Sequence, residues 1–489
     1  WPVEEARPPI QLPQGTTVTE AFLEVCARMG KSAAVADQIA GVLTYKKMQK
    51  AASALALHFR SLKGKHVGVL LPSSSVAFIV VLALMAAKKV PVMLNWTLGP
   101  KFLNDTLKQT DSEVVISSWK FVEKLSYVEF GDMIDKIAFL EDIKKHLPFK
   151  TKMKALWTSR KGIKGILKTL DLTDIHKDDE AVILFTSGTE SVPKGVPLTH
   201  ENILLNQKGS MTKVASKKDD IFLGVLPPFH SFGLSVAGLF PILAGLRIAF
   251  YPDPTDSLAL AKGIKKWEAT IFAAPPSFLK ALLHVAAKED LKTLRLIISG
   301  AEKMPESLFE EVKKLGEEKT LIQGYGITEC SPAVAINQPG EEAIGVGRPI
   351  SYISCCTVHP ETKKPLKPGE EGELCVSGPT VFKGYLDPSI NPFLEMDGKK
   401  WYMTGDIGRC DEKGNIILSG RLKRFAKIGG EMISLGAIEE AVLKYIAKDA
   451  EKPIAAVSSV EKDGKSFLDL FSTLVLDEVN INASLREAG

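Results

Sequence analysis

The chain has 489 residues, of which 45% are hydrophobic and 25% charged, and its formal net charge is +4. This composition is typical of a folded globular protein and excludes fibrous and disordered classes. The length exceeds what one hydrophobic core usually supports, so we expect two or three folding units. The small net charge gives no overall basic footprint, so we expect no nucleic-acid partner.

Cysteine usage and hydropathy indicate the compartment. The six cysteines show no C-x-x-C spacing and are Cys26, Cys330, Cys355, Cys356, Cys375 and Cys410. The longest apolar run, around residues 77–87, is shorter than the roughly 18 to 20 residues of a spanning helix and predicts a buried helix. We therefore expect a cytoplasmic protein. The chain begins at Trp1 without a methionine, which leaves open a targeting segment before it.

Short β-rich apolar runs alternate with helical patterns over most of the chain. Strands are predicted at residues 66–71, 90–94, 114–117, 181–186, 221–226, 246–251, 270–274 and 294–299, with helices at 77–87 and 101–110. This alternation predicts an α/β fold with parallel or mixed sheets covered by helices. Ligands of such sheets bind beyond the carboxyl ends of the strands, so the loops there are expected to carry the chemistry.

The sequence pattern changes near residue 357, where predicted strands separated by glycine and proline replace the alternation of strands and helices. We expect a small β-rich subdomain at about residues 345–420, within a large N-terminal domain that covers residues 1–420. A helix at 435–446 and two strand-like runs after it predict a small α+β domain at residues 421–489. The sequence stops before this domain is complete, so we expect it to be truncated.

A basic stretch lies at residues 152–170. It contains six basic residues and no acid: Lys152, Lys154, Arg160, Lys161, Lys164 and Lys168. Apolar residues between them predict the stripe of an amphipathic helix. Such a helix can contact an anionic membrane or an acidic protein. A solvated face on an ordinary surface helix is the alternative that we favour from sequence alone.

The strongest local motif is ILFTSGTESVPKG at residues 183–195, an apolar strand that runs into a loop with Thr186, Ser187, Gly188 and Thr189 and then Lys194. Free main-chain amides, hydroxyls and one ammonium together can hold phosphate groups. The segment is not a Walker A loop, because the lysine precedes a glycine and no hydroxyl follows. A hydrophilic turn is the alternative.

Three further motifs are expected in loops after strands. They read LPPFHSFG at residues 226–233, SGAEK at 299–303 and QGYGITE at 323–329. By themselves the first reads as a structural histidine and the second as a strand-to-helix turn. The third is more distinctive, because it sets an aromatic ring between two glycines and ends in a hydroxyl beside a carboxylate. A capped helix start is its alternative.

Two weaker segments follow, WYMTGD at residues 401–406 and GRLKRFAKIGGEM at residues 420–432. An aspartate in a glycine turn is usually only turn chemistry. All six segments, however, occur in the order of the motifs of the acyl-adenylate-forming superfamily, which includes acyl-CoA synthetases, luciferases and peptide-synthetase adenylation domains. The chain resembles that superfamily over nearly its whole length.

The resemblance implies ATP and Mg²⁺ as cofactors and assigns a nucleotide site. The loop residues 186–189 hold phosphates, and adenine lies along Gly300, Ala301 and Glu302. The ring of Tyr325, between Gly324 and Gly326, stacks on adenine. The ribose hydroxyls donate to Asp406 and accept from Arg421, which suits a carboxylate that can accept two hydrogen bonds.

The same resemblance assigns the reaction chemistry. Lys194 spreads phosphate charge, Thr328 contacts the α-phosphate, and Glu329 helps to hold Mg²⁺. One carboxylate suffices for such an ion, because phosphate oxygens complete its coordination. His230 and Phe232 are expected to form the wall between the substrate carboxylate and the acyl pocket.

A mobile C-terminal domain is also implied, with a hinge at Lys423 about which it turns between adenylation and thiol transfer. The turn brings Gly429 and Gly430 toward the thioester tunnel. Many relatives carry an acid after the hinge lysine, whereas this chain has Arg424. The family also has a second lysine near its C-terminus in a Pro/Thr-Gly-Lys segment. No such segment is present, and Gly464 with Lys465 reads as a hairpin turn, which favours truncation.

Residues 420–432 are most similar to acyl-[acyl-carrier-protein] synthetases, including those fused to glycerophospholipid acyltransferases. This likeness implies a fatty acid as substrate, the phosphopantetheine thiol of acyl carrier protein as acceptor, and a peripheral contact with the inner membrane. CoA as acceptor is the first alternative. A protein that binds nucleotide or acyl groups without catalysis is the second. The acyltransferase motif H-x-x-x-x-D does not occur in the sequence.

Overall fold

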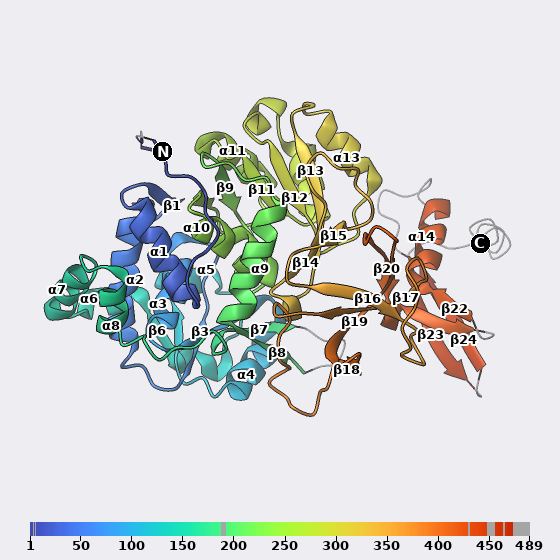
Figure 1. Ribbon diagram of the computed structural model, residues 1–489, viewed down its shortest axis with the longest axis horizontal. Helices are drawn as coiled ribbons and strands as arrows, with labels where there is room; N and C mark the ends of the chain where they lie inside the picture. Colours follow the sequence, from blue (N-terminus) through green and yellow to red (C-terminus); the bar gives the residue numbers. More distant parts are fainter. Residues whose placement is uncertain are drawn as a thin grey trace. The chain divides into compact units, whose positions relative to one another are not determined.

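The computed structural model describes residues 1–2, 4, 6–186, 192–428, 431–446, 455–462 and 465–472. The chain folds as two compact units (Figure 1). The first unit comprises Trp1–Ser354 and Ser377–Pro392, and the second comprises Cys355–Val376 and Phe393–Gly489. The predicted domain boundary at residue 420 and the hinge at Lys423 stay predictions.

A nine-stranded sheet forms one half of the first unit, in the order β15-β14-β13-β12-β11-β9-β10-β1-β2. In chain order the strands are β1 (Ala33–Asp37), β2 (Gly41–Thr44), β9 (Ile221–Gly224), β10 (Arg247–Phe250), β11 (Ile271–Ala274), β12 (Leu296–Ser299), β13 (Thr320–Gly326), β14 (Ala333–Ile336) and β15 (Arg348–Pro349). The strands from β13 to β1 pair in parallel, and antiparallel strands complete both edges.

A six-stranded sheet forms the other half, in the order β6-β5-β3-β4-β7-β8. Its strands are β3 (His66–Val69), β4 (Val90–Met93), β5 (Val115–Ser117), β6 (Ile137–Phe139), β7 (Glu180–Thr186) and β8 (Lys194–Thr199). All neighbours are parallel except β7 and β8, which form an antiparallel hairpin. The predicted α/β fold with mixed sheets is confirmed, with several strands shorter than expected.

The helices of the first unit cover and separate these sheets. They are α1 (Val18–Met29), α2 (Tyr45–Phe59), α3 (Ser75–Met85), η1 (Trp96–Leu98), α4 (Gly99–Gln109), α5 (Trp119–Lys124), η2 (Gly131–Lys136), α6 (Leu140–His146), α7 (Phe149–Thr158), α8 (Ile163–Thr169), α9 (His200–Lys213), η3 (Phe232–Leu239), α10 (Phe240–Ala244), α11 (Ser257–Trp267), α12 (Pro276–Val285), η4 (Lys288–Leu291), α13 (Glu306–Lys313) and η5 (Thr328–Cys330).

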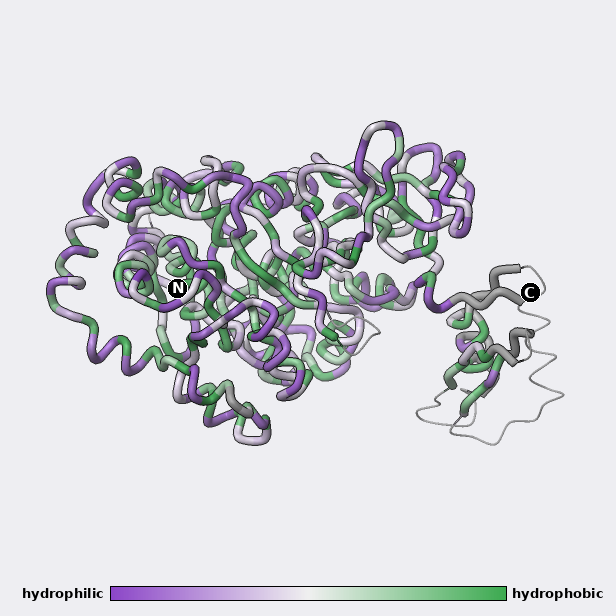
Figure 2. Tube along the Cα trace, turned by 90° about the horizontal axis from the view of Figure 1, so that it is seen from below, coloured by the Kyte–Doolittle hydropathy of each residue, from purple (hydrophilic) through white to green (hydrophobic). Residues whose placement is uncertain are grey.

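Helix α3 is buried almost all round, as its uniformly apolar sequence predicts. It follows a strand of the six-stranded sheet, yet its Phe78 stacks on Phe250 of the nine-stranded sheet with ring centroids 5.0 Å apart. A Cβ added at Gly238 would lie 1.9 Å from the Phe78 ring, so the close contact requires glycine there. Apolar and polar residues alternate over short distances along the chain, as expected of elements with one buried face (Figure 2).

The prediction that the basic stretch at residues 152–170 forms a single helix is wrong. Helix α7 ends with Ser159 as its C-cap, and α8 begins after Gly162. Gly162 has an extended conformation, with φ −64° and ψ 164°, which interrupts helical geometry. The stretch is therefore a pair of short helices.

The second unit begins with the predicted β-rich part, an antiparallel sheet ordered β16-β17-β19-β18 with β20 paired to β19. Its strands are β16 (Ser354–Val358), β17 (Gly372–Ser377), β18 (Phe393–Met396), β19 (Lys399–Cys410) and β20 (Ile416–Arg421). The remainder contains η6 (Leu422–Arg424), β21 (Phe425–Ile428), β22 (Glu431–Ser434), α14 (Leu435–Ile446), β23 (Ala455–Lys462) and β24 (Lys465–Ser472). The helix predicted at residues 435–446 is confirmed.

One buried histidine makes the stability of the first unit depend on pH. His200 begins α9, is only 3% exposed, and accepts a hydrogen bond from the Val18 N–H at its Nδ1, 3.3 Å away. Burial lowers the pKa of this imidazole to about 4. The unfolded chain, with a pKa near 6.5, therefore binds more protons between these two values.

We expect the free energy of unfolding to fall by up to about 3 kcal/mol as the pH drops from 6.5 to 4, because the buried ring must become charged. His200→Gln should lack this component. Urea unfolding of both proteins across this range measures the difference. An exposed histidine, changed in His284→Gln, is the matched control, and an equal pH dependence in all three proteins would contradict the assignment.

Candidate functional site

The β7–β8 hairpin positions the lysine of the predicted phosphate loop. Thr186 at the end of β7 is the cross-strand partner of Lys194 at the start of β8. The predicted residues Ser187, Gly188 and Thr189 lie outside the described residues. Where the chain returns to β8, the Gln109 side chain donates to the Pro193 carbonyl at 2.9 Å. Thr186 and Lys194 are thus side by side at the carboxyl end of β7.

Glu329 lies in η5, after the strand β13, and is 7% exposed. Its carboxylate accepts a hydrogen bond from the Tyr385 hydroxyl at 2.8 Å. The ring of Tyr385 also lies below Lys194, whose Nζ is 5.8 Å from the ring centroid. The neighbouring Thr328 hydroxyl lies 3.2 Å from the Ser231 hydroxyl. One tyrosine thus contacts both the predicted phosphate lysine and the predicted metal ligand.

Residues 379–386, which we call the connecting segment, bind the chain both beside Lys194 and at Glu329. The Leu386 N–H donates to the Gly195 carbonyl at 2.9 Å, and the Phe382 N–H donates to the Glu329 carbonyl at 2.8 Å. The Asn202 side chain donates to the carbonyls of Pro379 and Val381 at 2.8 and 3.1 Å. The sequence motifs did not predict a role for this segment, in which a Gly-Tyr pair in a loop is the only local feature that could have indicated one.

The two loops predicted to contact adenine are neighbours because β12 and β13 pair in parallel, with Ser299 opposite Gln323. A Cβ added at Gly300 would lie 2.5 Å from the Gly324 carbonyl oxygen, so only glycine allows this approach. Tyr325, which follows Gly324, is 9% exposed. Adjacent strand ends therefore bring the SGAEK and QGYGITE motifs together.

Two residues of the SGAEK loop show features that the sequence did not reveal. Ala301 has a φ of +71°, a left-handed conformation that is uncommon outside glycine. Glu302 accepts hydrogen bonds from the Ser277 N–H and hydroxyl at 3.0 and 2.8 Å. The predicted nucleotide contact of Glu302 stays a prediction, and its carboxylate here ties the loop to α12.

A cavity of about 100 Å³ lies beside these loops. Its lining includes six expected site residues: Phe232, Gly300, Ala301, Gly324, Tyr325 and Gly326. The rest of the lining is mainly apolar and includes residues of η3, α10, β12 and β14, together with Val214 after α9. No charged side chain is among the lining residues that the structure describes. The cavity is therefore suited to an apolar group that reaches the two loops predicted to contact adenine.

His230 lies just before η3, a π-helix, which is a conformation often found at functional sites. Its ring packs against Phe229, with centroids 4.5 Å apart. Although the residue is exposed to solvent, desolvation by the surrounding protein lowers the pKa of the imidazole. Phe232 lines the cavity, whereas within the described chain His230 is not among the lining residues.

The remaining expected residues belong to the second unit. Asp406 and Arg421 are cross-strand partners in β19 and β20, and the Arg421 Nε lies 2.7 Å from Asp406 Oδ1. Lys423 lies in η6, directly after β20. Gly429 and Gly430 lie outside the described residues. The structure therefore pairs the two predicted ribose residues with each other.

The described residues contain no group of three or more His, Cys, Asp and Glu side chains that would hold a metal ion by themselves. Glu329, with the Thr328 hydroxyl beside it, fits an ion that takes its other oxygens from phosphates and water. In the parts of the chain that are described, no helix has the length and apolar character needed to cross a bilayer.

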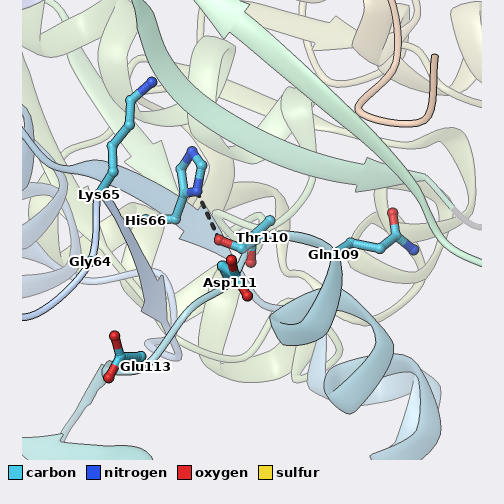
Figure 3. Close-up of a pocket in the computed structure, with 7 residues that line it drawn as sticks. All are labelled: Gly64, Lys65, His66, Gln109, Thr110, Asp111 and Glu113. Atoms are coloured by element: carbon cyan, nitrogen blue, oxygen red, sulfur yellow. Dashed lines mark hydrogen bonds between the residues drawn. The ribbon is translucent and has the colours of Figure 1, made fainter.

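A larger hollow, of about 620 Å³, lies at the amino end of β3 (Figure 3). It is lined by Gly64, Lys65, His66, Gln109, Thr110, Asp111 and Glu113. His66 Nδ1 lies 2.8 Å from the Thr110 carbonyl, and Lys65 forms an ion pair with Glu180 at 2.5 Å. Because the motif loops follow carboxyl ends of strands, this hollow is separate from the site described above.

Known proteins resemble the chain in sequence and in fold. It is 33% identical over 282 residues to the medium-chain fatty-acid–CoA ligase of Escherichia coli, a match that covers 55% of this chain and 48% of that enzyme, about half its length. The long-chain-fatty-acid–CoA ligase of Bacillus subtilis is 28% identical over 79% of this chain and 72% of its own length.

Among solved structures, ATP-bound MatB from Rhodopseudomonas palustris matches with a TM-score of 0.76 and 22% identity, over 96% of this chain and 92% of that one. The o-succinylbenzoate CoA synthetase MenE of Bacillus subtilis, in complex with ATP and magnesium, matches with a TM-score of 0.76 and 23% identity, over 96% and 93%. These two likenesses establish the fold. Residues 22–386 match the AMP-binding enzyme family, and the chain therefore belongs to that family within the acyl-adenylate-forming superfamily.

Proposed function

We propose that the chain activates a fatty acid with ATP to form an acyl-adenylate and pyrophosphate, and then passes the acyl group to a phosphopantetheine thiol. The observation that carries this proposal is the uncharged cavity, whose wall includes Gly300 and Tyr325 of the adenine loops. An apolar acyl chain placed there would bring its carboxylate next to the nucleotide. The family membership supports the first half-reaction.

In the proposed first step, a carboxylate oxygen attacks the α-phosphorus of ATP and the bond to pyrophosphate breaks. Lys194 and the Thr328 hydroxyl stabilise the negative charge on the phosphate oxygens. Mg²⁺ held by Glu329 would neutralise part of the same charge. The adenylate is a good leaving group, so a thiol can displace it without a protein nucleophile. Asp406, Arg421 and Lys423 keep their predicted ribose and hinge roles as part of this proposal.

A fatty acid is favoured over a charged acyl substrate. A dicarboxylate or an amino acid has a second charge, and burying that charge requires an opposite charge or several hydrogen-bond partners. Among described residues the cavity offers Val214, Val236 and Ile336 but no charged side chain. The names of the Escherichia coli and Bacillus subtilis relatives, both fatty-acid–CoA ligases, support the same substrate class.

An experiment has to distinguish between two acceptors of the acyl group. The similarity of residues 420–432 to acyl-[acyl-carrier-protein] synthetases favours acyl carrier protein, whereas the names of the two relatives favour CoA. Purified protein with labelled fatty acid, ATP and Mg²⁺ should be offered holo acyl carrier protein and CoA in separate reactions. We expect acyl transfer to the carrier protein. Transfer to CoA alone would replace that acceptor and leave the activation step intact.

A protein that binds nucleotide or acyl groups without catalysis is the rival function. Fatty-acid-dependent exchange of labelled pyrophosphate into ATP tests it, because exchange requires reversible adenylate formation. We expect exchange that depends on both fatty acid and Mg²⁺. Nucleotide binding without exchange by the full-length protein would favour the rival.

Tyr385 is proposed to position Glu329 through its hydroxyl. Tyr385→Phe keeps the ring below Lys194 but removes a hydrogen bond to a carboxylate, worth roughly 1.5–3 kcal/mol. We expect the Mg²⁺ concentration for half-maximal exchange to rise roughly tenfold or more. Tyr127→Phe, at a tyrosine that is 77% exposed, is the matched control. An unchanged Mg²⁺ requirement in Tyr385→Phe would contradict this role.

Gly300→Ala should weaken ATP binding, because the added Cβ would lie 2.5 Å from the Gly324 carbonyl and force the two adenine loops apart. We expect the affinity for ATP, measured by titration calorimetry, to fall roughly tenfold or more. Gly263→Ala is the control, since the nearest atom to its Cβ would be at 3.9 Å. Equal ATP affinity in Gly300→Ala and the unchanged protein would place adenine elsewhere.

A further inference from the structure

Helix α7 exposes large apolar side chains. Phe149 is 76% exposed and Trp157 62% exposed. With Met153 between them they are spaced i, i+4 and i+8, which puts all three on one face of the helix. The buried residues of α7 are the small Ala155 and Thr158. Met153 and Leu156 are half-buried. A surface helix ordinarily buries its large apolar residues, so the exposure of Phe149 and Trp157 is unusual.

Basic side chains accompany this apolar face along the sequence. The segment from residue 149 to residue 170 contains seven basic residues and no acid: Lys150, Lys152, Lys154, Arg160, Lys161, Lys164 and Lys168. All seven are exposed. The first acid after the segment, Asp171, accepts from Lys88 at 2.9 Å and is thus already paired with another cation.

Figure 1 places α6, α7 and α8 next to one another at the edge of the first unit. Helix α7 packs against α2 and α8. The face with Phe149, Met153 and Trp157 is opposite the one with Ala155 and Thr158 in the helical repeat, so it points away from the protein. We call these three residues and the seven basic ones the α7–α8 surface.

We propose that the α7–α8 surface docks the protein on an anionic lipid bilayer, with Phe149 and Trp157 among the headgroups and the basic side chains on lipid phosphates. Aromatic side chains favour the membrane interface, and lysine and arginine extend an apolar stem with a charged end. An acidic protein would match the charge but would give no reason for the exposed aromatic pair. The contact is peripheral, and both its charge and its apolar part are required for stable binding.

This inference deepens the proposed function by naming the place from which a fatty acid is collected. Its test is independent of activity, because lipid binding is measured without ATP. Failure of lipid binding with intact pyrophosphate exchange would overturn only the docking proposal. Loss of exchange with intact lipid binding would overturn only the proposed function.

Flotation with vesicles measures docking directly. We expect the purified protein to float with vesicles that mix phosphatidylcholine and phosphatidylglycerol, and to stay behind with phosphatidylcholine alone. Phe149→Ser with Trp157→Ser, and separately Lys150→Gln with Lys152→Gln and Lys154→Gln, should each reduce partitioning into anionic vesicles about tenfold or more. High salt should also release the protein.

Matched controls come from other exposed positions. Lys313→Gln with Lys314→Gln, at the end of α13 and its C-cap, removes two exposed charges elsewhere, and Tyr127→Ser removes an aromatic residue that is 77% exposed. Both controls should bind vesicles as the unchanged protein does. Thermal unfolding checks that each variant is folded, which is expected because the substituted side chains are exposed.

Two results would overturn the proposal. The first is equal vesicle binding by the aromatic variant and the unchanged protein, which would leave charge alone as the cause. The second is absence of vesicle binding, and saturable binding of holo acyl carrier protein that the lysine variant loses would then identify the partner. In the second case the α7–α8 surface would recognise an acidic protein.

Discussion

The main-chain hydrogen bonds of the connecting segment hold the candidate site together. Lys194 belongs to the six-stranded sheet and Glu329 follows a strand of the nine-stranded sheet, so strand pairing alone does not fix the distance between them. The N–H groups of Leu386 and Phe382 bind one carbonyl on each side. A Cβ at Gly195 would lie 2.5 Å from a Leu386 side-chain carbon, so a larger residue there would force that side chain to move. Residues 379–386 therefore set the spacing of the lysine and the carboxylate.

The sequence was sufficient for features with a local signal. Apolar runs that end in Gly-rich loops predicted the strands, and the parallel pairing of β12 with β13 explains why the SGAEK and QGYGITE motifs meet. Contacts between distant residues left no such signal. The hydrogen bond of Tyr385 to Glu329 joins residues 56 positions apart, and that of Ser277 to Glu302 joins residues 25 apart. The break between α7 and α8 depends on the extended backbone of Gly162, and helical periodicity does not reveal it.

The first unit separates two kinds of chemistry. The predicted phosphate and metal residues, Lys194 and Glu329, lie on polar loops joined by a tyrosine. The proposed acyl side is a cavity without charged side chains among its described lining residues, and the glycines at 300 and 324 lie where the two loops predicted to contact adenine meet it. Activation of an apolar acid by a highly charged nucleotide requires such a boundary, because each reactant would be poorly solvated in the other's environment. The basic and aromatic face of α7 would serve a third environment, the surface of a bilayer.

The cation–π contact between Lys194 and Tyr385 has a consequence for ligand exchange. Such a contact at a partly exposed site is worth about 0.5–1 kcal/mol, whereas breaking a buried ion pair by removing one partner costs about 3–5 kcal/mol. With Tyr385 between them, the ammonium faces an aromatic ring and the carboxylate has a hydroxyl donor. In the proposed reaction, a triphosphate that displaces the ring from Lys194 would therefore give up little binding energy. Among the described residues, this aromatic contact of the lysine is weak enough to be exchanged for a phosphate.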